Sequence, residues 1–348
     1  MNKIKNEIGL SGLEFVEFCS ADADSLRDLF ESFGFTKVAS HKKKAVELYR
    51  QGNINFILNS DDKSFARSFE RSHGPCVSSM AWRFNDVDHA YSLAQKRGAK
   101  ISLDSSDYTL ESGSKIPSAF GIGDSLIYFV NKENKNLYES MGFDFNNSSY
   151  IKGKGFTRID HLTNNVHKGT MKHWSDFYKH VFEFEEVKYF DIRGVKTGLT
   201  SYALRSPCGS FSIPINEGTE AKSQINEYLE EYKGPGVQHI AFSTDDIVSS
   251  VKSVKKTPIK TLTIDKEYYE EVFDRVKNVT EDHKVLEDLN ILVDGDDKGY
   301  LLQIFTKNVI GPIFIEMIQR KNHLSFGEGN FGALFRSIEK DQEDRGYL

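Results

Sequence analysis

An internal repeat constrains the fold of this chain more than any other feature. The segment 74–82 (GPCVSSMAW) matches the segment 234–242 (GPGVQHIAF) at an offset of 160 residues, and an Asp and a helical pattern follow each copy. The segment 13–18 resembles 159–164 in the same way, and each of these precedes an amphipathic helical pattern. Repeats of this kind are supersecondary units that bury their apolar faces against one another. We therefore expect four similar units.

Each unit is expected to contain one strand, one helix and then several strands. The helix expectation rests on apolar residues at helical spacing, such as Leu26, Leu29, Phe30 and Phe33, which end at Gly34. The strand expectation rests on short β-branched and aromatic runs such as 125–130 and 300–305. Two units per half predict an α+β protein with an N-terminal domain at 1–132 and a C-terminal domain at 153–348. Residues 133–152, rich in Asn and Ser and without periodicity, are the expected linker.

The composition narrows the class of protein. A formal net charge of −6 over 348 residues gives no support to binding of nucleic acid or of anionic membranes. The three cysteines, Cys19, Cys76 and Cys208, are too scattered for a disulfide framework or a structural zinc site. About 18 consecutive apolar residues would be needed for a membrane helix, and the sequence has no such run. We therefore expect a cytoplasmic protein without nucleic-acid or membrane partners.

Three predicted strands of the C-terminal half each carry one potential metal ligand. His239 follows His161 by 78 residues, and Glu316 follows His239 by 77. Two histidines and one carboxylate hold non-haem ferrous iron on one face and leave the other face open. A single strand histidine is more often a core or surface residue, and an arginine could compensate Glu316 in place of a metal. The equivalent placement of all three in duplicated units favours a metal site.

The N-terminal half differs at the matching places. Phe15, Ser79 and Tyr128 align with the three potential ligands of the C-terminal half. These three side chains do not make a ferrous site. The N-terminal half is therefore predicted to be a copy without metal chemistry that serves packing, oligomer contacts or shielding.

Long segments of the C-terminal half resemble the 4-hydroxyphenylpyruvate dioxygenase family. The matching segments are 159–217, 222–225, 236–241, 302–306, 313–320 and 326–331, whereas the N-terminal half matches mainly through 123–130. The resemblance implies two vicinal-oxygen-chelate domains of the glyoxalase and bleomycin-resistance type. Each would be built from paired βαβββ modules that form a half-open barrel.

The resemblance also implies the chemistry. A family member holds one Fe²⁺ per chain through residues that match His161, His239 and Glu316, and it converts 4-hydroxyphenylpyruvate and O₂ to homogentisate and CO₂ in tyrosine and phenylalanine catabolism. The keto acid is part of the substrate, so no external 2-oxoglutarate is needed. A homo-oligomer, either a dimer or a tetramer, is expected.

Further site residues follow from the resemblance. The polar residues expected to act in catalysis are Gln224, Gln238, Gln303 and Asn216, and the residues expected to contact the substrate are Ser201, Pro214, Phe305, Phe314, Phe326 and Phe331. Strand alternation predicts that Gln238 faces away from its neighbour His239.

A C-terminal lid helix is predicted after the last strand. Asn330 is a candidate N-cap for a helix through Leu334, Phe335 and Ile338. The run 327–329, Gly-Glu-Gly, would provide a hinge for this helix.

Two other functions remain open at this point. One is 4-hydroxymandelate synthase, which has the same ligands and substrate but oxidises the benzylic carbon; Pro214, Asn216 and the closing phenylalanines resemble the ring-oxidising branch instead. The other is a metal-free protein of the same fold that binds a small aromatic molecule. The intact ligand set argues against this second alternative.

Overall fold

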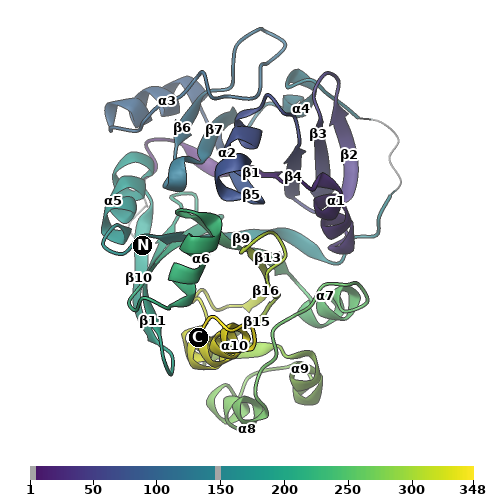
Figure 1. The fold of residues 1–348 in the computed structure, drawn as a ribbon, viewed down its shortest axis with the longest axis vertical. Coiled ribbons are helices and arrows are strands. Elements are labelled where there is room, and N and C mark those ends of the chain that lie inside the picture. Colours follow the sequence, from purple (N-terminus) through teal and green to yellow (C-terminus); the bar gives the residue numbers. More distant parts are fainter. Residues whose placement is uncertain (1–4, 146–149) are drawn as a thin grey trace.

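Two eight-stranded sheets, one from each half of the chain, form the fold (Figure 1). The computed structural model describes residues 5–145 and 150–348. In spatial order, the strands of the first sheet are β6 (Ser118–Phe120), β7 (Leu126–Asn131), β5 (Cys76–Phe84), β1 (Leu10–Cys19), β4 (Ile54–Asn59), β3 (Val46–Gln51), β2 (Thr36–His41) and β8 (Phe143–Asp144). Those of the second sheet are β10 (Glu185–Arg193), β11 (Gly198–Arg205), β12 (Ser212–Gly218), β9 (Phe156–Val166), β13 (Gly236–Thr244), β16 (Phe314–Lys321), β15 (Gly299–Phe305) and β14 (Leu292–Asp296).

Helices pack around both sheets (Figure 1). The N-terminal half contributes α1 (Ala23–Ser32), α2 (Phe65–His73), α3 (Val87–Lys96), the 3₁₀ turn η1 (Ile122–Asp124) and α4 (Leu137–Ser140). The C-terminal half contributes α5 (Met171–Phe182), α6 (Gln224–Tyr232), α7 (Ile247–Val254), α8 (Lys266–Arg275), α9 (His283–Leu289), the 3₁₀ turn η2 (Glu328–Asn330) and α10 (Phe331–Asp344). In the described part of the chain, no helix has both the length and the apolar character needed to cross a bilayer.

The strand pairing repeats in both halves, as the sequence repeat predicts. At the centre of each sheet the first strands of two units pair antiparallel, β1 with β5 and β9 with β13. Within each unit the last strand pairs parallel with the first, as β4 does with β1 and β16 with β13. Each sheet therefore curls into a half-barrel. The predicted fold class is confirmed.

The register confirms the alignment of the two halves. In the second sheet Ala241 is opposite both His161 and Glu316. In the first sheet Ala81 is opposite both Phe15 and Tyr128. The rings of Phe15 and Tyr128 lie 6.0 Å apart inside a buried apolar cluster. Aromatic side chains thus take the positions that His161 and Glu316 have in the second half, and Ser79, at the position of His239, donates to Glu17.

Aromatic side chains also join the two halves. Trp82 of the first sheet packs edge-on against Phe182, with ring centroids 4.8 Å apart, and Phe242 of the second sheet packs against Phe33 at 5.5 Å. One continuous apolar core contains all four of these residues. The second sheet is therefore supported from behind by the first.

The expected linker at 133–152 is partly ordered. Helix α4 and strand β8 lie within it, and β8 pairs with β2 of the first sheet. Leu137, Tyr138 and Phe143 are buried in the N-terminal cluster. Residues 137–144 of this segment therefore pack onto the first sheet, and too few apolar side chains lie here to show a periodicity in the sequence. The domain boundaries at 132 and 153 stay a prediction, and 146–149 lie outside the described residues.

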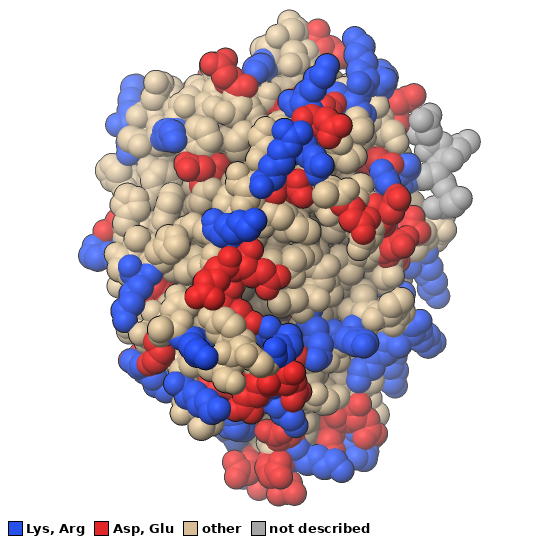
Figure 2. All heavy atoms as spheres, in the orientation of Figure 1, with Lys and Arg blue, Asp and Glu red and all other residues tan. Residues whose placement is uncertain are grey.

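Charges of both signs share the surface (Figure 2). Lysine and arginine side chains are interspersed with aspartate and glutamate on the face shown. The charged tract at 265–284 forms α8 and the first residues of α9.

A buried carboxylate in the N-terminal half gives a testable pH dependence. Glu17 of β1 is fully buried and accepts hydrogen bonds from Ser79, from Tyr108 at 2.5 Å and from Asn59 at 2.8 Å. Burial and then the charge of Asp107 raise the pKa of Glu17 to about 7. Between its ordinary value and about 7 the folded state holds a proton that the unfolded state has lost, so stability falls as pH rises through this window.

We expect Glu17→Gln to flatten this dependence, because glutamine does not ionise. At pH 8 the variant should be more stable than the wild type by about 1–2 kcal/mol, and at pH 5 the difference should shrink. Unfolding midpoints in denaturant at the two pH values measure this. The exposed Glu139→Gln is the control, and an equal change with pH in wild type and Glu17→Gln would contradict the assignment.

Candidate metal centre

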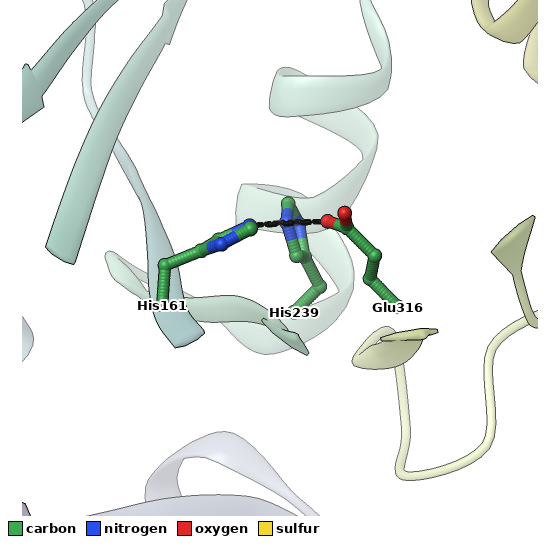
Figure 3. Close-up of side chains that lie close together, drawn as sticks. All are labelled: His161, His239 and Glu316. Carbon is green, nitrogen blue, oxygen red and sulfur yellow. Dashed lines mark hydrogen bonds and ion pairs between the residues drawn. The ribbon is translucent and has the colours of Figure 1, made fainter. Parts of the chain in front are cut away.

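Three donor atoms from three strands converge inside the second half-barrel (Figure 3). Nε2 of His161 lies 3.0 Å from Oε2 of Glu316, and Nε2 of His239 lies 3.3 Å from Nε2 of His161 and 3.4 Å from Oε2 of Glu316. Among the described residues this is the one cluster of its kind with metal-binding potential. The three residues predicted from the spacing are therefore brought together.

The donor set fits a metal with a facial arrangement of ligands. Metal–donor bonds of about 2.1 Å at right angles place the donors about 3 Å apart, close to the observed distances. The side chains of His161 and Glu316 are only 3% and 2% exposed, so a carboxylate here needs a positive partner. A cation at the point to which the three atoms are directed would supply that charge.

Two β-bulges set the direction of the histidines. In the pairing of β9 with β13, Asp160 and Gln238 are each an extra residue without an opposite partner. Each bulge residue directly precedes a ligand histidine. The first sheet has irregularities at the equivalent residues, Glu14 and Ser78.

The bulge corrects the expectation for Gln238. Strand alternation predicted that its side chain faces away from His239, but Gln238 lines the same cavity as His239. Its Oε1 lies 3.0 Å from Nδ1 of His239. Alternation fails here because the extra residue in the strand interrupts the regular pleat.

The remaining donors and acceptors of the three residues are also engaged. Nδ1 of His161 lies 2.9 Å from Oδ1 of Asp160, and Oε1 of Glu316 accepts a hydrogen bond of 2.9 Å from Nε2 of Gln303. Partners of this kind orient metal ligands and select the histidine tautomer. Nε2 of each histidine and Oε2 of Glu316 thus face the centre of the site, where Oγ1 of Thr163 also lies 3.0 Å from Nε2 of His239.

The charges of the site are strongly coupled. Burial disfavours the charged ring of His161, but the negative charge of Glu316 and the hydrogen bond to Asp160 outweigh it and raise the pKa of His161 to about 9. Burial likewise opposes the carboxylate of Glu316, yet His161 and His239 lower its pKa to about 2. Burial lowers the pKa of His239. Metal binding at such a site displaces a proton.

A largely apolar cavity opens from the three donors. It is lined by every site residue predicted from the resemblance, namely Ser201, Pro214, Asn216, Gln224, Gln238, Gln303, Phe305, Phe314, Phe326 and Phe331. Seven lining residues were not predicted as contacts, namely Thr163, Phe190, Ile192, Leu199, Leu334, Phe335 and Ile338. Most of the seven are apolar, and nothing in the sequence distinguishes them from residues of the core. Leu334, Phe335 and Ile338 could be found through the lid helix to which they belong.

Aromatic rings surround the donors. Phe314 stacks on His239 with centroids 4.7 Å apart, and Phe326 meets His161 edge-on at 5.5 Å. Phe190 bridges Phe326 and Phe331, at 6.2 Å and 5.3 Å. The rings give the cavity an apolar, aromatic wall beside the donors.

Residues of helix α10 line one side of the cavity, and its role as a lid stays a prediction. Asn330 stands at its N-cap position, but no side-chain capping bond is present. The Asn330 side chain instead donates to Gln303 and accepts from Tyr268, at 3.0 Å and 2.7 Å. The expected capping role is therefore wrong, because two buried partners compete for the amide. Gly327, in the proposed hinge, has φ +82, which favours glycine.

A buried carboxylate anchors the middle of α10. Glu339 accepts backbone N–H groups from Val195, Lys196 and Thr197, at 3.1, 3.0 and 2.9 Å. These amides belong to the turn between β10 and β11. A Cβ at Gly194 would come within 2.6 Å of Glu339, so the close approach requires glycine. The lid helix is thus tied to the opposite wall of the cavity.

Comparisons with known proteins cover nearly the whole chain. Residues 4–146 match the family described as hydroxyphenylpyruvate dioxygenase, N-terminal, and residues 158–288 match the glyoxalase, bleomycin resistance protein and dioxygenase superfamily. The chain is 52% identical to Protein MelA of Shewanella colwelliana, covering 99% of both chains. It is 44% identical to 4-hydroxyphenylpyruvate dioxygenase of Pseudomonas aeruginosa, covering 99% of this chain and 97% of that one.

A solved structure shows the same fold. A mutant of 4-hydroxymandelate synthase from Streptomyces coelicolor superposes with a TM-score of 0.85 and 23% sequence identity, covering 96% of this chain and 99% of that one. This likeness concerns the architecture alone.

Proposed function

The chain belongs to the 4-hydroxyphenylpyruvate dioxygenase family, and from that membership we propose that it converts 4-hydroxyphenylpyruvate and O₂ to homogentisate and CO₂ at one ferrous ion per chain. The chain is an enzyme of the dioxygenase class. The observation that carries the assignment of the site is the convergence of His161, His239 and Glu316 at one end of an aromatic cavity.

The three residues provide a facial ligand set. A ferrous ion held there would supply the redox and Lewis-acid chemistry by which the keto acid is oxidised with O₂. The protein holds the ligand side chains in position. Gln238 and Gln303 fix the orientation of His239 and Glu316 from behind, through the bonds described above.

The cavity suits the aromatic end of the substrate. Phe305, Phe314 and Phe326 border the donors, and such walls hold a ring and keep water away from reactive species. Ser201, Asn216 and Gln224 add polar groups to this lining. We propose that these three side chains receive the phenol hydroxyl and that α10 closes over the bound substrate.

The two alternatives are weaker. A metal-free binding protein does not need three converging donor atoms on side chains that are each held by a further hydrogen bond. A 4-hydroxymandelate synthase would share the metal site, so only the product separates it from the proposed reaction. We also infer a cytoplasmic homo-oligomer from the family; light scattering of the purified protein measures the oligomeric state.

The product is the decisive test. Purified protein supplied with ferrous iron, 4-hydroxyphenylpyruvate and O₂ should yield homogentisate and one CO₂ per O₂ consumed, identified by mass spectrometry against a standard. Cells expressing the protein without a ring-cleaving enzyme should darken their medium, because homogentisate oxidises in air to a brown polymer. Finding 4-hydroxymandelate as the product would contradict oxidation at the ring. Recovering only unreacted keto acid from protein that has bound iron would refute the enzyme assignment.

A further inference from the structure

One arginine connects a metal ligand to the wall of the cavity. Arg320 of β16 forms a two-pronged pair with Asp160, with Nε 2.9 Å from Oδ2 and Nη2 2.8 Å from Oδ1. The Asp160 oxygen Oδ1 also lies 2.9 Å from Nδ1 of His161. A continuous chain therefore runs from guanidinium to carboxylate to imidazole.

This chain is shielded from water. The side chains of Arg320 and Asp160 are 12% and 8% exposed. Hydrogen bonds to charged groups in such surroundings are shorter and stronger than neutral ones, and the planar guanidinium matches a carboxylate in a way that lysine does not. Asp160 is therefore held in one orientation, although as a bulge residue it has no strand partner opposite it.

The orientation of Asp160 decides which nitrogen of His161 carries the proton. A carboxylate 2.9 Å from Nδ1 accepts the N–H at that atom. The lone pair of the neutral ring then lies on Nε2, the atom directed at Glu316 and His239.

The same guanidinium also holds the segment that precedes the lid. Nη1 of Arg320 donates to the backbone carbonyls of His323 and Ser325, at 3.1 Å and 2.5 Å. The guanidinium carbon lies 5.7 Å from the centre of the Phe326 ring, and that ring meets His161 edge-on. Arg320 thus contacts both Asp160, which bonds the ligand His161, and the segment that carries Phe326 of the cavity wall.

We propose that Asp160 and Arg320 are positioning residues that fix His161 for metal binding and hold the 323–326 segment beside it. This inference rests on the proposed metal site and adds two residues to it. Loss of Asp160 affects the ligand alone, because the bonds of Arg320 to the carbonyls remain. Loss of Arg320 affects both the ligand and the segment.

The test measures metal affinity and segment protection separately from turnover. Co²⁺ binding is measured by chelator competition, and amide hydrogen exchange is measured over residues 322–327. Asp160→Asn should weaken Co²⁺ binding about 10- to 100-fold, the usual effect of removing such a partner, with exchange of the segment unchanged. Arg320→Gln should weaken binding and also speed exchange in the segment. Compared with Arg320→Gln, Arg320→Lys should regain part of the Co²⁺ affinity but not the protection of the segment, because lysine lacks the branched guanidinium group.

Arg158 provides a matched control. It also approaches Asp160, at 3.8 Å from Oδ2, but its side chain is 48% exposed. Arg158→Gln should bind Co²⁺ as the wild type does. Wild-type affinity in a folded Asp160→Asn protein would overturn the positioning role and leave the metal site intact. Absence of Co²⁺ binding in the wild type would instead overturn the metal site, and this inference with it.

Discussion

The His161→Ala protein is expected to fold, to hold far less than one ferrous ion per chain and to show no measurable turnover. His161 supplies one of the three converging donors, and its Nε2 lies 3.0 Å from Oε2 of Glu316. A bound metal contributes several kcal/mol to catalysis of this type, so a loss of at least about 10³-fold in rate follows. Metal analysis and oxygen consumption with 4-hydroxyphenylpyruvate measure the two effects.

The fold should survive this change, because the strand ladders of β9 and β13 use backbone groups alone. Circular dichroism checks this point. His180→Ala, on the exposed side of α5, is the matched control and should keep full metal content and activity. Near-normal turnover of His161→Ala in buffer with added iron would show that the ligand assignment is wrong.

The Glu339→Ala protein is expected to have a lid helix that opens far more often. The change removes the acceptor of three backbone amides and of the Thr197 hydroxyl, which lies 3.1 Å from the carboxylate. Bonds to a charged acceptor contribute about 1.5–3 kcal/mol each, and water can replace part of them when the helix opens. We expect local opening of α10 to become easier by about 2–4 kcal/mol, or about 30- to 1,000-fold.

Amide hydrogen exchange over residues 331–344 measures this opening, and KM for the keto acid should rise with it. Glu343→Ala is the matched control on the same helix, because Glu343 forms an exposed ion pair with Lys196 that contributes about 0–1 kcal/mol. Glu339→Gln should be intermediate, since one oxygen remains. Equal exchange in Glu339→Ala and Glu343→Ala would exclude the anchoring role.

The repeat and the ligands were readable from the sequence because each rests on residue types at fixed intervals. An offset of 160 residues aligned Ser79 with His239, and the register of both sheets agrees. The βαβββ order followed from strand and helix patterns that recur in every unit. The pairing of strands from different units was also predictable, because the repeat implied it.

Other features were beyond the sequence because they depend on competition in three dimensions. Asn330 has the chemistry of an N-cap, but Gln303 and Tyr268 engage its amide instead. Gln238 faces the cavity because of one extra residue in a strand, and a bulge has no side-chain signature. The anchoring role of Glu339 was hidden for a similar reason. A glutamate on an amphipathic helix gives no hint of the distant turn that binds it.

The bulges also record the history of the chain. Glu14 and Ser78 of the first sheet stand where Asp160 and Gln238 stand in the second. Shared backbone irregularities at equivalent places indicate inheritance from one ancestral module, because removing a single residue would turn the rest of a strand to its other face. Divergence between the copies therefore exchanged side chains on an unchanged backbone. In such a lineage a catalytic centre is gained or lost by a few point substitutions, while the barrel that carries it persists.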